Sequence, residues 1–571
     1  MTAGRGSTRP PPGPGPRTAA ELVVAAMREE EVAAAFGLVG THIVEIYEAL
    51  REEEVSVAFG LVGTHIVEIY EALRGAPEIA HVTAKHEGNA ALMADAYTRL
   101  SGKTSVCFST AGPGLLNSIS GIGQAYAGNS PTVHISGSLP LGSPRRALHA
   151  VDDEDYSVAV VAPVTRMSVR PRTLAQLARL LPRCFAAARG GEPGPVHIEI
   201  PWDLMRAAPA AAPRYVRRAW RHGVNGSQLR ALSDDLERAR RPLFVIDALC
   251  LRHGLVGGVM RLAEAAGAMV AVSYDAFGAV PSAHPLNASV LSDFYFGTTA
   301  SAAVAEADLI AGFGVLTGGE VEALIMAHAK ARPVLFDGRS AAALAQRGAL
   351  ERLADRLAPG AAGPAWFSRR CGEEWQAAVT RLAGPRRRGR MHFGRAMLRL
   401  RSWIDADMTV ILDAGSHEIW ARSTLPSFGP LSFIGSGNWG GMGYGLPGLI
   451  GARMARPERR AVAITGDGCL LMAIADLCTL ASVGGPAVLI VMNNAMYGEI
   501  KRVQLERFGA ASQVDIPRLD FAAIARDFGL QGIRVAAEDG LGPAFRRAFA
   551  SRRPVVVDVA CGTDVAFPSL P

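Results

Sequence analysis

The sequence predicts an α/β protein with three doubly wound domains, each built on a parallel β-sheet. Its length of 571 residues exceeds what one hydrophobic core usually holds and favours three domains. Short runs of apolar, often β-branched residues end in Gly, Ser or Asp and are followed by Ala- and Leu-rich stretches of helical length. Such continuously apolar strands are typical of parallel sheets that helices cover on both faces. Ligands are then expected at the carboxyl ends of the strands.

Two segments rich in Pro, Ala and Gly, at 205–215 and 358–390, divide the chain. We expect a disordered tail over residues 1–18, followed by domains over 19–204, 216–357 and 391–565. The clearest strand segments are 104–114, 130–137, 241–248, 307–314, 332–338, 408–415, 461–468, 486–494 and 553–561.

Composition and charge exclude several classes of protein. The chain is 49% hydrophobic and 20% charged, as globular domains are. No apolar run approaches the roughly 18 residues of a membrane span, so we expect no membrane association. The net charge of +6 comes from arginines scattered along the chain, which does not favour nucleic-acid binding. Seven cysteines without a CxxC pair argue against zinc and disulfide frameworks and favour a cytoplasmic location.

A 23-residue segment occurs twice in tandem, at 28–50 and 51–73, with differences at only two positions. Solenoid repeats come in longer runs and diverge more, so an in-frame duplication or an error in the sequence record explains the pair better. Each copy reads as a strand, a glycine turn and a helix. Only one copy can occupy the native position, and the other adds an edge strand or loops out.

The stretch TGDGCLL (465–471) places Asp467 between two glycines at the end of an apolar strand. An acid there can form a turn, bind a ribose or hold a metal ion. The next strand ends at Asn493 and Asn494, and neighbouring parallel strands would bring Asp467 and Asn494 together. A helix beginning near Cys469 would offer free N–H groups to a phosphate. Mg²⁺ commonly binds through one or two carboxylates and substrate phosphates, so we interpret Asp467 as a metal ligand beneath a diphosphate.

A dinucleotide site is the alternative, because GSGNWG (435–440) matches G-x-G-x-x-G. The acid follows the first glycine by about 30 positions where about 20 are expected. Pro447 also interrupts the helix that this motif requires. The motif alone is therefore weak support for NAD or FAD.

The combination of GDG (466–468) and NN (493–494) resembles the thiamine-diphosphate signature of the acetolactate synthase and pyruvate decarboxylase superfamily. The resemblance extends to KHEGNAALMADAYTRLSGK (85–103), FSTAGPGLLN (108–117), GPVHIEIPWD (194–203) and GSGNWGGMGYGLPGLIGA (435–452). It implies two thiamine-diphosphate-binding domains flanking a central Rossmann-like domain. It also implies a homodimer or a dimer of dimers, because in this superfamily each site forms between two subunits.

The resemblance assigns roles to residues. Mg²⁺ would be held by Asp467, Asn494 and the backbone carbonyl of Met496. Glu87 would bond the pyrimidine N1′ and so promote loss of the thiazolium C2 proton. Further cofactor contacts are implied for Gly415, Ser416, His417, Gly440, Met442, Gly468, Cys469, Asn494 and Tyr497.

The implied reaction is acetolactate-synthase-like carboligation, in which the ylid attacks a 2-oxo acid, CO₂ leaves and the remainder passes to a second carbonyl. Simple 2-oxo-acid decarboxylation and a non-catalytic cofactor-binding role remain alternatives. FAD is doubtful, because GFGVLTGGEVE (312–322) lacks the arginine expected there. Candidate substrate residues are Thr64, His65, Ser109, Thr110, His149 and Glu499, with Thr41 and His42 as the equivalents of the first two in the other copy.

Overall fold

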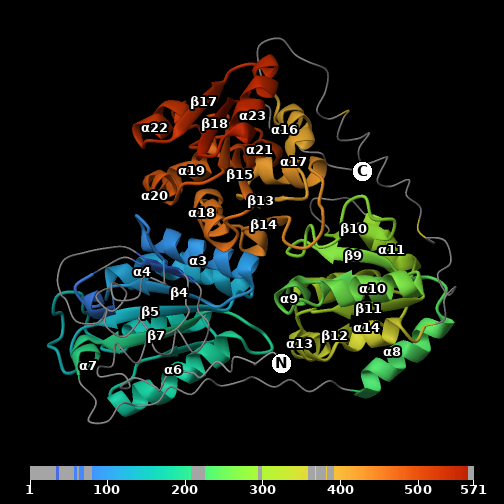
Figure 1. The fold of residues 1–571 in the computed structure, drawn as a ribbon, viewed down its shortest axis with the longest axis horizontal. Coiled ribbons are helices and arrows are strands. Elements are labelled where there is room, and N and C mark those ends of the chain that lie inside the picture. The colour runs from blue at the N-terminus through green and yellow to red at the C-terminus, as the bar shows by residue number, and fades with distance from the viewer. Residues whose placement is uncertain are drawn as a thin grey trace, which may run out of the picture.

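The computed structural model describes residues 34–37, 57–60, 63–69, 80–207, 226–292, 299–357, 367, 381 and 391–562. The expected tail over 1–18 and most of both linker segments lie outside these residues. The described chain forms three α/β domains around three sheets, which confirms the fold class (Figure 1). In this part of the chain, no helix combines the length and the hydropathy needed to cross a membrane.

The first sheet has seven strands in the order β1-β3-β2-β4-β5-β7-β6. Its pairings are parallel, apart from one antiparallel pair between β1 and β2. The strands are β1 (Ala34–Gly37), β2 (Val57–Gly60), β3 (Ala80–Thr83), β4 (Ser105–Ser109), β5 (Thr132–Ser138), β6 (Met167–Val169) and β7 (Val196–Pro201). The helices are α3 (Glu87–Ser101), α4 (Pro113–Ala127), α5 (Tyr156–Val161), α6 (Leu174–Ala188) and α7 (Trp202–Arg206).

The central sheet has five parallel strands in the order β10-β9-β8-β11-β12. They are β8 (Pro242–Ile246), β9 (Met269–Ser273), β10 (Asn287–Leu291), β11 (Leu309–Phe313) and β12 (Val334–Phe336). The helices are α8 (Gly226–Arg238), α9 (Ala248–Arg252), α10 (Val256–Ala266), α11 (Thr299–Glu306), α12 (Glu320–His328), α13 (Gly338–Arg347) and α14 (Ala349–Ala354). Buried aliphatic and Phe side chains from both faces form its core.

The third sheet has six parallel strands in the order β14-β13-β15-β16-β18-β17. They are β13 (Met408–Leu412), β14 (Phe433–Gly435), β15 (Arg460–Gly466), β16 (Ala487–Asn493), β17 (Gln531–Val535) and β18 (Val555–Ala560). The helices include α16 (Phe393–Leu400), α17 (Ser416–Thr424), α18 (Gly445–Ala455), α19 (Asp467–Ala473), α20 (Leu477–Val483), α21 (Gly498–Phe508), α22 (Phe521–Asp527) and α23 (Leu541–Ala550). All nine strand segments expected from the sequence are strands in the structure.

The first and third domains pack against each other through α3 and α18, as Figure 1 shows. The contact is close because Gly451 lies against the backbone of Met93, where a Cβ would come within 2.4 Å of the carbonyl oxygen. Buried polar bonds fix the same interface. Tyr444 Oη donates to Asp95 at 2.8 Å, and Asn89 Nδ2 donates to Asp476 at 2.6 Å.

The two repeat copies compete for one position in the first sheet. Phe36 of β1 and Phe59 of β2 both pair with Val82 of β3 and with Cys107 of β4. Both copies therefore pair with the same residues of β3 and β4, and the expectation that only one copy takes the native position stays a prediction. Beyond the strand, Ile66 and Ile69 of the second copy are buried in the core of the first domain.

Because the copies share one register, we predict that either can supply the strand. Ala35→Pro and Ala58→Pro occupy equivalent positions and each removes a ladder N–H from one copy. Each single variant should unfold within a few degrees of the wild type, whereas the double variant should lose the first domain's cooperative unfolding. Differential scanning calorimetry measures this. A single variant as damaging as the double would show that one copy alone holds the position.

Candidate active site

The ends of β15 and β16 bring the predicted metal ligands together. The strands pair in register up to Gly466 opposite Met492, so Asp467 and Asn494 follow at the same edge. Asp467 Oδ1 accepts the Gly468 N–H at 2.9 Å, and Oδ2 accepts the N–H of Ala495. Ala495 has a φ of 60°, a left-handed turn that brings this N–H to the carboxylate. The helix α19 begins at Asp467, two residues earlier than expected.

The electrostatics of this corner favour a cation. Burial raises the pKa of Asp467 to about 6, although backbone N–H groups oppose the shift. No group of three His, Cys, Asp or Glu side chains converges anywhere in the described residues. A metal here would rely on one carboxylate, the amide of Asn494 and the carbonyl of Met496. Such a hard-oxygen set, with positions left for phosphate and water, suits Mg²⁺.

A cavity of about 420 Å³ adjoins this corner, and Asp467, Asn494 and Met496 all line it. Ser416 and His417, at the N-terminus of α17, also line it. Ser416 Oγ and His417 Nε2 are buried without a hydrogen-bond partner. Burial lowers the pKa of His417 to about 4, so its ring is neutral near pH 7. Orphaned polar atoms beside a helix N-terminus fit a diphosphate group.

The loop between β14 and α18 forms the next part of the cavity wall. Gly440 has a φ of 63°, which favours glycine, and both Gly440 and Met442 line the cavity. A Cβ on Gly468 would lie 2.7 Å from the Tyr497 ring, so a glycine is needed there. Gly415 and Cys469 also face the cavity, as expected. No helix begins directly after GSGNWG, because α18 starts only at Gly445, which argues against the dinucleotide alternative.

Asp413 holds this loop, and sequence reasoning missed it. Its carboxylate is fully buried and accepts the N–H groups of Gly443, Tyr444 and Gly445 at 2.8–3.1 Å. Thr465 Oγ1 donates to it as well, at 2.8 Å. Burial raises its pKa despite these bonds. Its sequence signal is the same as that of Asp467, since it directly follows a buried strand.

A second cluster lies at the carboxyl edge of the first sheet. Glu87 follows β3, Thr110 follows β4 and His149 lies in the loop after β5. Glu87 is almost fully buried, and its Oε2 accepts Asn117 Nδ2 at 3.1 Å. A Cβ on Gly114 would lie 3.2 Å from Glu87 Oε1, so the small residue lets the α4 turn approach the acid.

The candidate substrate residues near this cluster differ in their burial and in their hydrogen-bond partners. His65 and His149 meet edge to face with ring centroids 5.3 Å apart. His65 Nδ1 and Thr110 Oγ1 are buried without a partner, whereas Thr64 is exposed. Burial, followed by the charge of His149, lowers the pKa of His65 to about 4. Ser109 Oγ instead pairs with His134 Nε2 at 2.8 Å inside the domain.

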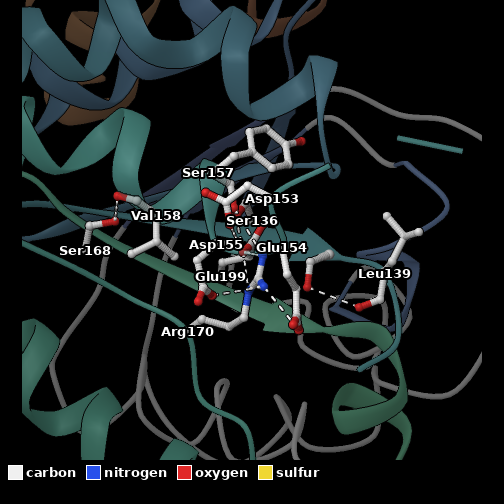
Figure 2. A network of polar contacts seen from close by, with 12 residues as sticks. Ser136, Leu139, Asp153, Glu154, Asp155, Ser157, Val158, Ser168, Arg170 and Glu199 are labelled. Carbon is white, nitrogen blue, oxygen red and sulfur yellow. Dashed lines mark hydrogen bonds and ion pairs between the residues drawn. The ribbon is translucent and has the colours of Figure 1, made fainter. Parts of the chain in front are cut away.

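A network around Arg170 anchors the loop that carries His149 (Figure 2). Arg170 Nε donates to Glu199 of β7 at 2.6 Å, and Ser157 Oγ donates to the same carboxylate at 2.7 Å. Arg170 also forms an ion pair at 3.2 Å with Asp155, the last of four consecutive acidic residues at 152–155. The loop is thereby tied to the sheet. His149 itself has a φ of 70°, a conformation rare for residues other than glycine.

The predicted residues thus form two groups at two different sheets. The third-domain group, including Tyr497 and Glu499, lines the cavity, and Glu87 lies outside that lining. Sequence reasoning also missed the central domain's contribution. Tyr274, Leu291, Ser292, Glu320, Val321 and Leu324 line the cavity. They follow or end strands of the central sheet, or begin α12, so the rule of carboxyl strand ends could have found them.

The fold and the corner at Asp467 would suit an enzyme that binds a metal ion and a phosphorylated cofactor. Three family models match the chain in order. They are the N-terminal TPP binding domain of thiamine pyrophosphate enzymes over 46–156, the central domain over 229–318 and the C-terminal TPP binding domain over 413–559. The first match includes the whole second repeat copy and only the end of the first.

Curated relatives match over nearly the whole chain. An acetolactate synthase large subunit of Parasynechococcus marenigrum is 30% identical over 84% of this chain and 80% of its own. A probable 2-ketoarginine decarboxylase of Pseudomonas aeruginosa is 32% identical over 90% of this chain and 88% of its own. The acetolactate synthase isozyme 2 large subunit of Escherichia coli is 28% identical, over 95% of each chain. The chain belongs to the thiamine pyrophosphate enzyme family.

We predict that Asp467→Asn abolishes Mg²⁺-dependent uptake of thiamine diphosphate. An amide cannot supply the charge, and its NH₂ would face a backbone N–H. The dissociation constant from calorimetry in 5 mM Mg²⁺ should rise by about 100-fold or more, as expected for loss of a ligating carboxylate. Asp527→Asn, at an exposed position on α22, is the control and should bind as the wild type does. Unchanged binding by Asp467→Asn would contradict the assignment.

Proposed function

We propose that this protein is a thiamine-diphosphate- and Mg²⁺-dependent enzyme that acts on a 2-oxo acid and transfers the decarboxylated fragment to a second carbonyl, as an acetolactate synthase does. The observation that carries the proposal is the corner where Asp467 and Asn494 meet beside the orphaned Ser416 and His417. Similarity to acetolactate synthase subunits supports the choice of reaction.

The proposed role of each residue follows from its position in the cavity. Asp467, Asn494 and the carbonyl of Met496 hold Mg²⁺, while Ser416 and His417 donate to the diphosphate. Met442 and Gly440 shape the wall against which the rings rest. When bound, thiamine diphosphate supplies the carbon nucleophile and the electron sink for this chemistry.

Glu87 completes the site from a second copy of the chain. Within one chain it sits at the edge of a different sheet and outside the cavity lining. Its carboxyl group, which accepts a hydrogen bond from Asn117, would exchange a proton with a ring nitrogen of the cofactor. A homodimer, or a dimer of dimers, would bring Glu87 of one copy to Asp467 of the other.

Complementation between two inactive variants tests this arrangement. Glu87→Gln should bind the cofactor but lose CO₂ release by about 10²–10⁴-fold, the usual cost of removing a proton-transfer group. Glu87→Gln and Asp467→Asn, refolded together, should regain roughly a quarter of the wild-type rate, since random pairing gives half mixed dimers with one intact site each. CO₂ release from pyruvate and longer 2-oxo acids is the assay.

Three outcomes would count against the proposal. Full activity of Glu87→Gln would reject its role. If mass spectrometry shows that mixed dimers form but the mixture regains no activity, both residues would belong to the site of one chain. A wild type that binds the cofactor without converting any 2-oxo acid would favour the non-catalytic alternative.

A second candidate is simple decarboxylation, with release of an aldehyde. The paired His65 and His149 rings favour it, because a proton donor near the reacting carbon ends the reaction before a second carbonyl adds. The 32% identity to a probable 2-ketoarginine decarboxylase points the same way.

The ratio of aldehyde to coupled hydroxyketone formed by His149→Asn distinguishes the two reactions. If His149 donates the final proton, the variant should release aldehyde about 100-fold more slowly and shift the remaining product towards the coupled hydroxyketone. Gas chromatography of the products measures the ratio, and His284→Asn in the central domain is the control. An unchanged ratio would show that His149 does not control this step.

A further inference from the structure

The central domain contributes a carboxylate to the wall of the cofactor cavity. The helix α12 begins at Glu320, just beyond the turn that follows β11, and Glu320 lines the cavity together with Val321 and Leu324. Leu291 at the end of β10 extends this apolar wall. Glu320 itself is exposed, so its carboxylate is open to a ligand at the edge of this aliphatic wall, where a partner of opposite charge is favoured.

The position of the Glu320 carboxylate is fixed from the third domain. Its Oε2 accepts Asn438 Nδ2 at 2.9 Å, and the backbone N–H of Asn438 donates to Asp275 Oδ1 at 3.1 Å. Asn438 lies two residues before Gly440, in the loop that shapes the cavity. The carboxylate is therefore tied to the same loop that supports the cofactor rings.

Glu320 differs from the other acidic residues of the cavity lining in the partners of its carboxylate. Glu418 pairs with Arg422 and Glu499 pairs with Arg502, both at 2.7 Å. Asp467 is bonded to backbone N–H groups at the metal corner. Among the described residues, no Lys or Arg lines the cavity, and Glu320 makes no ion pair there.

We propose that Glu320 is a specificity-determining residue that binds a cationic nitrogen group at the far end of the 2-oxo-acid substrate. The inference rests on the proposed function. A guanidinium can donate two parallel N–H bonds to the carboxylate while its methylene stem packs on Leu291, Val321 and Leu324. A substrate with a second carboxylate is disfavoured, because this wall offers it a like charge and no described cation.

Three 2-oxo acids of equal chain length test the proposal, ending in guanidinium, methyl or carboxylate. The wild type should show the highest kcat/KM for the guanidinium substrate and the lowest for the carboxylate substrate. Glu320→Gln should reduce the guanidinium-to-methyl ratio of kcat/KM by about 10- to 100-fold, the range for a charged hydrogen bond. Glu320→Arg should move the preference towards the carboxylate substrate.

The matched control is Glu322→Gln, two residues further along the first turn of the same helix. Glu322 Oε2 accepts the Gly318 N–H at 2.6 Å and lies outside the cavity lining, so its variant should keep the wild-type ratio. Thiamine diphosphate affinity of Glu320→Gln, measured by calorimetry, should equal that of the wild type. A large loss of cofactor affinity would mean that Glu320 is structural and would overturn the proposal.

Failure of the proposed function gives a different pattern from failure of this inference. If no 2-oxo acid is converted, the binding of a substrate analogue still tests the role of Glu320. A guanidino-alkanoate without the 2-oxo group should bind the cofactor-loaded wild type at least 10-fold more tightly than Glu320→Gln in calorimetry. Equal binding by both proteins, an unchanged substrate ratio in Glu320→Gln, or a wild type that prefers the carboxylate substrate would overturn the role of Glu320.

Discussion

The parallel pairing of β15 with β16 sets the position of the two side chains that would hold the metal ion, Asp467 and Asn494. Because the two strands run in register, Asp467 and Asn494 leave the sheet side by side, and the left-handed turn at Ala495 returns an N–H to the carboxylate. β13, paired on the other side of β15, delivers Ser416 and His417 to the same edge. One sheet edge thus gathers a carboxylate and an amide, a helix N-terminus and unsatisfied polar atoms, a combination that suits a phosphorylated cofactor.

The same rule of strand ends operates in all three domains, with different chemistry at each edge. The third sheet provides the proposed oxygen ligands and phosphate donors, and the first sheet provides an acid, a threonine and paired histidines. The central sheet provides an apolar wall with one carboxylate. Glu87 and the cavity belong to different sheet edges of one chain, and the proposed site therefore takes Glu87 from a second copy. Fold alone does not choose the reaction, and in the proposal the residues of the first and central edges would do so.

Much of the fold was predictable from the sequence, because apolar runs mark the strands and polar residues mark the strand ends. The fold class and the expected strands are confirmed, and Asp467 and Asn494 follow paired strands at one sheet edge, because each follows from local patterns and parallel pairing. That only one repeat copy takes the native position stays a prediction. The roles of the site residues remain predictions. Asp413 was missed although it carries the same signal as Asp467, and Glu320 was missed because its importance depends on packing between domains. The side chain of Ser109 points to His134, which a strand pattern cannot reveal.

The most direct test of the central claim is a crystal structure of the protein with thiamine diphosphate and Mn²⁺ in place of Mg²⁺, using the anomalous signal of the metal. The account predicts one strong peak per chain, between the Asp467 carboxylate and the Asn494 amide, with Glu87 from another chain within hydrogen-bond distance of the cofactor's pyrimidine ring. A peak elsewhere, or a pyrimidine ring contacted by Glu87 of the same chain, would contradict it.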